Sequence, residues 1–486
     1  MSAQQELAII DPQIQEVKKI LWGEHIKGDL FSRWSQGFIY SAEELTALVQ
    51  TDGGPCAVIA PVQAFLLKQV LTDSKTIQNN FNEEQVDGLL CQALTEILQQ
   101  VSSSTDANNV DQQLSLSEPI PNHSSPPPVT TNEQSCATTS NSLASPPKYS
   151  LVFLRKQEQH QQNVPEDTPE SVAAPETEPA VAKKVTSAED KFHSRLSLEK
   201  LNRIEDVHKR LLENVNLLKG EYGVLQFLYS VLLTKGVTSL VEEMSENNEL
   251  IDPVHGHGSQ CLINLLLTGR GVNYVWDNDQ DLGGLTLKGI CRRCEVGFLT
   301  VLERLRYCEV GSYLKNPKFP VWVVGSETHL TVIFSLDMRL VDPETPGERA
   351  RRIFHSFDPD GNNFIQAVLL EDVMRTLDLY ADPAYVDIMK KKLDPESLGI
   401  VLLEGFMDEF FPNEPLRGPD TFTLYHYNGL CRPSSNTKIR YKEGNAILLE
   451  SNLGAVSDEN KILTCLQTKW PSIDVQWVDG VTPSID

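Results

Sequence analysis

The chain has 486 residues and a formal net charge of −25 at pH 7, because 67 acidic residues outnumber 42 Lys and Arg. No basic stripe interrupts this acidity, which argues against a nucleic-acid-binding protein. No apolar run is long enough to span a bilayer and no signal peptide is evident, so we expect no membrane contact and an intracellular protein. Nine scattered cysteines are typical of reduced thiols in the nucleus or cytoplasm.

The first predicted element is a helix that begins at Pro12, where Asp11 supplies the N-cap and proline fits the first helical position. Residues 34–40 are short and aromatic and are predicted to be extended. Residues 82–98 follow as an amphipathic helix, with Asn82 and Gln85 as a capping pair.

Between these elements, a glycine-rich turn leads into an apolar helix. Gly53 and Gly54 stop regular structure just before Cys56, and apolar residues recur at helical spacing after it. The unpaired N–H groups of a helix N-terminus favour a thiolate, so this position suits a nucleophile. Gln50 is a side-chain donor that can stabilise the oxyanion of acyl transfer, and the glycines let a substrate backbone approach. Alternatively, Cys56 is a small buried side chain beside a loop.

From residue 101 to residue 197, Ser, Thr, Asn, Gln and Pro largely replace the apolar periodicity. Such a segment cannot offset its ordering entropy, so we expect a mostly disordered insertion. One apolar island, residues 149–155, is predicted to be a strand that returns to the main sheet. The alternative is a partner-binding motif.

Globular patterning then resumes, and three helices are predicted: residues 221–235, 260–268 and 295–307. His255 and His257 lie in a glycine-rich loop, where a loop role is favoured over metal binding. Cys291 and Cys294 form a lone C-x-x-C pair. Neither pair has further ligands at a matching spacing, so we expect no metal and no cofactor.

A predicted β-hairpin carries the second reactive side chain. Residues 320–324 and 329–334 are strand-like, with a turn between them. His329 lies at the mouth of this hairpin, where it can present an imidazole to a helix N-terminus in an adjoining layer. The alternative is a hydrogen-bonded histidine at a strand end. The spacing selects no third residue to orient it, although Asp342 and Asp358 lie downstream.

Residues 358–369 match the calcium-loop template only in part. Oxygen-bearing side chains occupy its first, third and fifth positions. Asn363 stands where glycine is usual, and Leu369 stands where a bidentate glutamate is needed. Since helical patterns flank this loop and a second helix pair follows, we predict a degenerate EF-hand-like helical module at residues 346–412.

After residue 412 strand patterns return, at residues 422–427, 440–441, 446–449 and 473–478. His426 is the only other histidine in a strand context that could act as a base, and it ranks below His329.

Several of these stretches resemble the MINDY deubiquitinases. Residues 53–57, with Gln50 before them, resemble that family's nucleophile loop, and residues 325–332 resemble its histidine strand. Three further stretches are similar to the branch with a degenerate EF-hand segment: residues 251–259, 425–430 and 466–471. The resemblance covers most of the chain outside residues 100–197. It implies cysteine-dependent cleavage of ubiquitin chains, with a preference for lysine-48 linkages and with ubiquitin as partner.

The expected fold is therefore α+β, a papain-like cysteine protease fold in which a helical layer carries Cys56 and a mainly antiparallel sheet carries His329. The expected domain organisation is as follows: residues 1–100 with the nucleophile helix, the insertion 101–197, residues 198–345 with the base-bearing strand, the module 346–412, and strands 413–486 that complete the catalytic domain.

In this reading Cys56 is the nucleophile, His329 the general base and acid, and Gln50 part of the oxyanion hole. Gly53 and Gly54 would bind the glycine tail of ubiquitin. Three alternatives remain: an inactive relative that binds ubiquitin, an EF-hand-like adaptor, and another cysteine acyl-transfer enzyme such as a small-molecule amidase.

Overall fold

The computed structural model describes residues 11–73, 81–115, 147–155, 187–245, 249–342, 345–358, 362–412, 419–431, 438–449 and 460–486. Two compact units emerge from the contacts between these residues. The first comprises the described residues up to Leu336 together with Thr421–Asp486, and the second comprises Asp337–Asp420.

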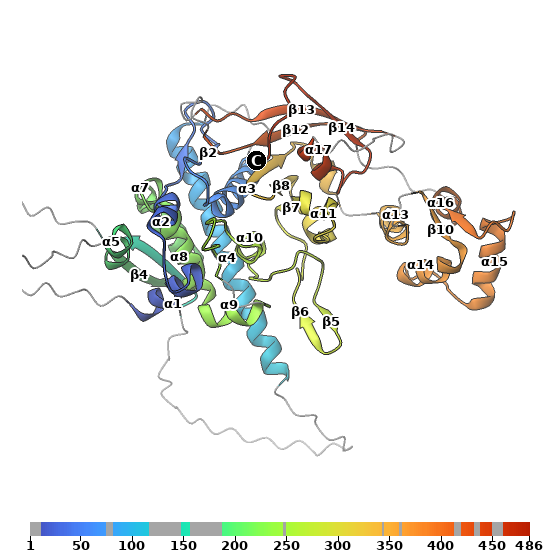
Figure 1. Ribbon diagram of the computed structural model, residues 1–486, viewed down its shortest axis with the longest axis horizontal. Helices are drawn as coiled ribbons and strands as arrows, with labels where there is room; N and C mark the ends of the chain where they lie inside the picture. Colours follow the sequence, from blue (N-terminus) through green and yellow to red (C-terminus); the bar gives the residue numbers. More distant parts are fainter. Residues whose placement is uncertain are drawn as a thin grey trace, which may run out of the picture. The chain divides into compact units, whose positions relative to one another are not determined.

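The first unit combines a layer of helices with a six-stranded sheet (Figure 1). Its helices are α1 Pro12–Trp22, α2 Gly28–Trp34, α3 Cys56–Asp73, α4 Glu83–Ser115, α5 Ala188–Ser194, α6 Ile204–Glu213, α7 Val215–Lys219, α8 Gly223–Lys235, α9 Val237–Glu243, α10 Gln260–Thr268, α11 Val301–Arg304, α12 Ser312–Lys315 and α17 Lys461–Leu466. Within the described ranges no single helix is long and apolar enough to cross a bilayer; α8 and α9 reach that length only together, across a 78° bend.

Helix α3 is the centre of this unit. Every residue from Gly54 to Val70 is buried, and the helix contacts α4 and α10 as well as two strands of the sheet. Burial of an apolar side chain contributes roughly 1.5–3 kcal/mol. The start of α3 is therefore held firmly between the helical layer and the sheet.

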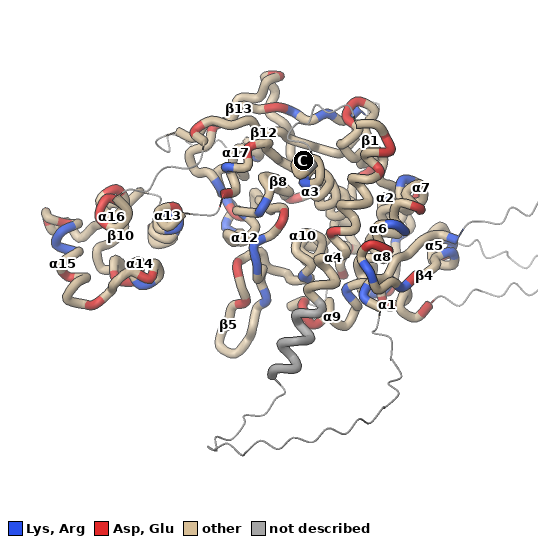
Figure 2. The backbone as a smooth tube through the Cα atoms, turned by 180° about the vertical axis from the view of Figure 1, so that it is seen from behind, with Lys and Arg blue, Asp and Glu red and all other residues tan. Residues whose placement is uncertain are grey.

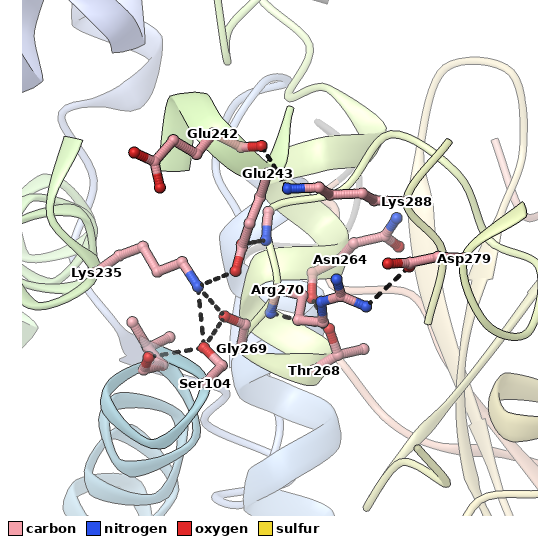
Figure 3. A network of polar contacts seen from close by, with 12 residues as sticks. Ser104, Lys235, Glu242, Glu243, Asn264, Thr268, Gly269, Arg270, Asp279 and Lys288 are labelled. Atoms are coloured by element: carbon pink, nitrogen blue, oxygen red, sulfur yellow. Dashed lines mark hydrogen bonds and ion pairs between the residues drawn. The ribbon is translucent and has the colours of Figure 1, made fainter. Parts of the chain in front are cut away.

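A buried ion pair joins several helices of the layer (Figure 3). The ammonium of Lys235, at the end of α8, lies 2.6 Å from the Glu243 carboxylate of α9. It also donates to Ser104 of α4 at 3.0 Å and to the carbonyl of Gly269, just after α10, at 3.1 Å. Because both charged side chains are at most 1% exposed, removing either one leaves an unpaired buried charge, which costs roughly 3–5 kcal/mol.

The sheet has the strand order β14-β13-β12-β9-β8-β7. Its strands are β7 Gly297–Thr300, β8 Val321–Gly325, β9 Leu330–Phe334, β12 Thr421–Tyr427, β13 Lys442–Leu448 and β14 Ile473–Trp477. All neighbours are antiparallel except β7 and β8, which are parallel. The mixed α+β architecture and the predicted hairpin, now β8 and β9, are thus present.

The prediction of a helix at residues 295–307 is wrong. Residues 297–300 form the edge strand β7, and only the short α11 follows it. A β-carbon on Gly297 would lie 2.3 Å from the Trp322 ring of β8, so the two backbones approach closely there. Tertiary pairing with β8 outweighs the local helical pattern.

The apolar island at residues 149–155 is a strand, but it does not join the main sheet. It forms β3, Tyr149–Leu154, which pairs antiparallel with β4, Leu196–Leu201. Three side chains of α8, one turn apart, accept the N–H groups on the other edge of β3: Gln226 from Leu154, Ser230 from Val152 and Thr234 from Ser150. Side chains of a helix thus accept the hydrogen bonds that a third strand would accept. The apolar pattern of residues 149–155 does not by itself predict this arrangement.

Part of the predicted insertion at residues 101–197 is regular structure. Helix α4 continues to Ser115, and α5 begins after a capping box at Ser187. Residues 116–146 and 156–186, on which the prediction of disorder also rests, lie outside the described residues. Two small antiparallel pairs complete the unit: β1 Ile39–Tyr40 with β2 Leu48–Val49, and β5 Gln280–Leu282 with β6 Leu285–Leu287.

The second unit has its own apolar core, which includes Phe354 and Phe406. Its elements are η1 Met338–Val341, α13 Pro346–Ser356, β10 Phe364–Gln366, η2 Ala367–Leu369, α14 Leu370–Thr376, α15 Pro383–Leu393, β11 Ile400–Leu402 and α16 Leu403–Phe410. They form two helix–loop–helix pairs whose loops join through the antiparallel strands β10 and β11. Figure 2 shows Lys and Arg interspersed with Asp and Glu along the described chain.

Candidate active site

Cys56 is the first residue of α3, and it lies almost completely buried. Its thiol is oriented toward the carbonyl oxygen of Gly54 at 3.7 Å. Burial raises the pKa of Cys56 to about 11, although the backbone N–H groups of Leu330 and Ala57 act in the opposite direction. The expectation that a helix N-terminus would favour the thiolate is therefore not met in this conformation, because desolvation of the charged form dominates.

The loop before Cys56 is closed on itself. The side-chain NH2 of Gln50 donates to the carbonyl of Asp52 at 2.8 Å. The backbone of Gln50 bridges to the segment after β12: its N–H donates to Gly429 at 2.8 Å and its carbonyl accepts from Cys431 at 2.9 Å. The donor group of Gln50 is thus occupied within the loop that precedes Cys56.

The two glycines of the loop differ in environment. Gly53 is exposed, and a β-carbon there would meet open space. Gly54 is buried with φ +130°, and a β-carbon there would lie 2.9 Å from Nε1 of Trp34. That nitrogen donates to the carbonyl of Gly256 at 2.9 Å. Gly54 is therefore required for close packing inside the chain itself.

His329 directly precedes β9 and is 7% exposed. The hydroxyl of Ser326 accepts its N–H at 3.0 Å, and its carbonyl accepts the N–H of Ser326 at 2.9 Å, so the turn before the strand is fixed. Burial lowers the pKa of His329, whereas the hydrogen bond with Asn428 and the charge of Asp486 raise it. Neutral imidazole is favoured here.

Asn428, the residue after β12, is the orienting partner that sequence analysis did not identify. Its Oδ1 lies 3.1 Å from Nε2 of His329. The same oxygen accepts the N–H of Leu430 at 3.1 Å, while the amide nitrogen donates to the carbonyl of Ser484 at 3.1 Å. Because these contacts assign Oδ1 as an acceptor, Nε2 carries the proton and Nδ1 keeps its lone pair. Asp342 and Asp358, two acidic residues that follow the hairpin in the sequence, belong to the second unit.

The sequence contained two signals for Asn428. It begins the Asn-Gly turn after a predicted strand, and it lies within residues 425–430, which carry part of the family resemblance. Neither signal indicates that the turn lies beside a histidine almost a hundred residues earlier. That proximity follows from the pairing of β12 with β9.

Two elements bring the thiol and the imidazole to the same place. Helix α3 contacts β9, and the N–H that reaches the sulfur of Cys56 belongs to Leu330, the residue after His329. Gln50 reaches the same site through its backbone bond to Gly429, the residue after Asn428. A thiol at a helix start, an imidazole at a strand end and an amide behind the imidazole form the constellation of a cysteine hydrolase.

His426 and the two loop histidines, His255 and His257, do not share these features. His426 of β12 is 2% exposed, and its Nε2 has no hydrogen-bond partner among the described residues. Burial lowers its pKa to about 3, so it is neutral. His255 and His257 lie in the loop before α10. Gly258 of this loop packs closely on α3, since a β-carbon at Gly258 would lie 2.3 Å from the β-carbon of Ala57. This loop covers one side of the α3 start.

Comparison with known proteins agrees with this geometry. The model of the MINDY-3/4 deubiquitinating-enzyme conserved domain matches residues 18–363. The chain belongs to this family of deubiquitinating enzymes. Membership places it among the thiol-dependent ubiquitin hydrolases.

The MINDY-3 relatives align over nearly the whole chain. A Drosophila melanogaster protein named ubiquitin carboxyl-terminal hydrolase MINDY-3 homolog is 44% identical, over 98% of this chain and 83% of that protein. The human ubiquitin carboxyl-terminal hydrolase MINDY-3 is 43% identical, over 97% of this chain and 99% of that protein. A Xenopus tropicalis probable MINDY-4 hydrolase is 26% identical over 68% of this chain. No solved structure matches the fold.

Proposed function

We propose that this protein hydrolyses isopeptide bonds in lysine-48-linked ubiquitin chains through a thioester on Cys56. The observation that carries the proposal is the hydrogen bond between His329 Nε2 and Asn428 Oδ1, at 3.1 Å. It leaves Nδ1 as the base while the adjacent Leu330 N–H contacts the thiol. The names of the MINDY-3 relatives support ubiquitin as substrate. The lysine-48 preference rests on the family resemblance.

The proposed chemistry has two halves. Nδ1 of His329 takes the proton of the Cys56 thiol, and the sulfur attacks the carbonyl carbon of ubiquitin's terminal glycine. Gln50 and the Cys56 N–H stabilise the oxyanion, and the imidazolium then protonates the departing lysine amine. In the second half His329 deprotonates a water, which attacks the thioester and releases the ubiquitin carboxylate and the thiol.

Substrate binding must change the loop in this mechanism. Gln50 now donates to Asp52, and the carbonyl of Gly54 faces the sulfur. We propose that the ubiquitin tail displaces this carbonyl and frees the Gln50 amide for the oxyanion. Gly53, which is exposed and without close neighbours, can lie along the tail.

For the architecture we propose a papain-like catalytic domain with an EF-hand-like insertion. In the second unit Asp358 accepts the N–H groups of Asn362 and Asn363, and Asp394 accepts those of Leu398 and Gly399. Such a first-position carboxylate is typical of calcium loops. Position twelve, however, is Leu369 in one loop and Gly405 in the other. We therefore propose a calcium-free paired module and, from the family resemblance and the cysteines, a nuclear or cytoplasmic enzyme.

The test is a ubiquitin probe with a thiol-reactive C-terminus, followed by hydrolysis of lysine-48-linked and lysine-63-linked chains. The wild type should be labelled and should cleave the lysine-48 chains faster. Cys56→Ala should lose both activities, whereas Cys291→Ala, which changes an exposed cysteine elsewhere, should retain them. Chain binding without labelling or cleavage by the wild type would instead indicate a ubiquitin-binding adaptor.

A further inference from the structure

The segment at residues 481–486 returns to the site after β14, and the chemistry described above assigns it no role. The carbonyl of Ser484 accepts the amide NH2 of Asn428 at 3.1 Å. The side chain of Asp486 faces His329 and the hydroxyl of Ser326. The ribbon view and the tube view both place Asp486 at the C label, beside α3 and β8 (Figures 1 and 2).

This segment is anchored and does not merely lie on the surface. Ile485 is 1% exposed, in contrast to Val481 at 58%. The carboxylate of Asp486 pairs with Lys461 of α17 at 2.7 Å. Within the segment, the hydroxyl of Ser484 accepts the N–H of Asp486 at 3.2 Å. A buried anchor, an ion pair and a local turn therefore hold the Ser484 carbonyl in place.

The contact with Asn428 matters because an asparagine amide has two ends of similar shape. Only the carbonyl end can accept the proton of His329 Nε2, and a half-turn of the side chain would present a second donor instead. The Ser484 carbonyl can only accept, so it selects the orientation in which Oδ1 faces the imidazole. Ile485, buried directly after Ser484, holds the backbone that presents this carbonyl.

We propose that residues 484–486 are a positioning element of the catalytic site: Ser484 holds the Asn428 amide in the orientation that keeps Nδ1 of His329 free as base, and Asp486 stabilises the imidazolium. The inference rests on the proposed function, because it assigns the segment to the same reaction. Besides the Cys56 thiol of the proposed reaction, the titratable groups of the described residues that act on His329 are Asp486, His257 and His426. Asp486 is the only acidic group among them.

A self-inhibiting cover is the main competing interpretation, and the contacts argue against it. The segment's bonds to other elements go to Asn428, Ser326, Lys461 and Lys442. The groups that face the Cys56 sulfur come from the glycine loop, α3 and β9 instead. The segment therefore contacts the amide that pairs with Nε2 of His329, and none of these contacts is with the Cys56 sulfur.

The test compares Ile485→Asp, which removes the anchor, with Val481→Asp, which places the same charge at an exposed position of the same segment. With lysine-48-linked diubiquitin, Ile485→Asp should lower kcat by about tenfold or more, with KM changed by less than about twofold. The acid limb of the kcat–pH profile should move to lower pH, because the Asn428 hydrogen bond and the Asp486 charge both raise the pKa of His329. Val481→Asp and the conservative Ile485→Val should behave like the wild type. Thermal unfolding of each variant checks that the chain is folded.

A double-mutant cycle separates positioning from general damage. Because Ser484 acts through Asn428, Ile485→Asp should lower kcat much less in an Asn428→Ala background, where only the contribution of Asp486, about threefold, is left to lose. If the loss caused by Ile485→Asp is as large in the Asn428→Ala background as in the wild type, the inference is overturned. It is also overturned if Ile485→Asp alone makes the enzyme faster, and that result would favour a self-inhibiting cover. If Ile485→Asp does not fold, Asp486→Asn takes its place, with a smaller loss of about threefold and the same shift of the acid limb.

One measurement does not depend on activity. In the wild type the Nε2 proton of His329 should exchange slowly with solvent and be visible by NMR, and Ile485→Asp should abolish that signal. If the wild type cleaves no ubiquitin chain, the proposed function fails while this signal still tests the positioning. If the chains are cleaved but the signal is unchanged in Ile485→Asp, only the positioning inference fails.

Discussion

The two sides of the active site differ in how far they are organised for reaction. On the base side, the imidazole of His329, the Asn428 amide and the Ser484 carbonyl form an unbroken series of hydrogen bonds. On the nucleophile side, the glycine loop turns its own Gly54 carbonyl toward the sulfur and occupies the Gln50 donor. The proposed base is thus preorganised, whereas the proposed nucleophile is held in a resting arrangement.

Burial acts on both sides and disfavours charge on each. It raises the pKa of the Cys56 thiol and lowers the pKa of the His329 imidazole, so the neutral pair is stable in this conformation. Strand pairing fixes the base side, since His329 and Asn428 flank neighbouring strands. The loop at residues 51–55 has no such constraint, and it is where we expect substrate to act.

The largest predicted effect is on the base side. His329→Gln should lower kcat for diubiquitin hydrolysis by about 10²–10⁴-fold, because general acid–base catalysis contributes in that range. His426→Gln is the matched control, since it changes a neutral, buried histidine of the neighbouring strand. Its kcat, measured on folded protein, should stay within a fewfold of the wild type. Equal losses in the two variants would contradict the assignment of the base.

The next effect concerns the donor on the nucleophile side. Gln50→Ala should lower kcat by about 10²–10³-fold, as expected for loss of one oxyanion donor. Gln36 makes a useful control because its amide also donates to the Asp52 carbonyl, at 3.1 Å. Gln36→Ala should therefore loosen the loop without this loss. A comparable fall in kcat for Gln36→Ala would show that both glutamines only hold the loop closed.

The sequence predicted the local structure around the proposed reactive groups better than their distant contacts. Cys56 and His329 could be found because a glycine turn before an apolar helix and an alternating hairpin are local patterns. Helix α3 begins at Cys56 and β9 begins one residue after His329. The roles of these residues stay predictions until hydrolysis is measured.

The features that the sequence could not predict depend on contacts between residues far apart in the chain. Asn428 reaches His329 through the register of two strands about a hundred residues apart, and β7 forms because Gly297 admits the Trp322 ring. The raised pKa of Cys56 has the same origin: it reflects burial by the whole fold, which a helix N-terminus alone does not predict.

The third prediction uses the pKa of the free nucleophile. With a thiol pKa raised to about 11, alkylation of Cys56 by iodoacetamide should be slow at pH 7 and rise about tenfold per pH unit up to pH 9, because only the thiolate reacts. In urea, the alkylation rate of the same cysteine should level off above its ordinary pKa of about 8.5. The rate is followed on the Cys56 peptide by mass spectrometry. A native rate that is flat between pH 6 and pH 8 would instead indicate a preformed thiolate–imidazolium pair.

The smallest effect distinguishes the two glycines of the loop. Gly54→Ala places a β-carbon 2.9 Å from Nε1 of Trp34 at φ +130°, so it should lower the free energy of unfolding by roughly 1–3 kcal/mol. Gly53→Ala meets open space and should change it by less than about 0.5 kcal/mol. Urea titration measures both. If strain at Gly54 also releases the carbonyl from the sulfur, Cys56 alkylation at pH 7 should be faster in Gly54→Ala alone. Equal stability and equal alkylation in the two variants would mean that Gly54 does not hold the nucleophile side closed.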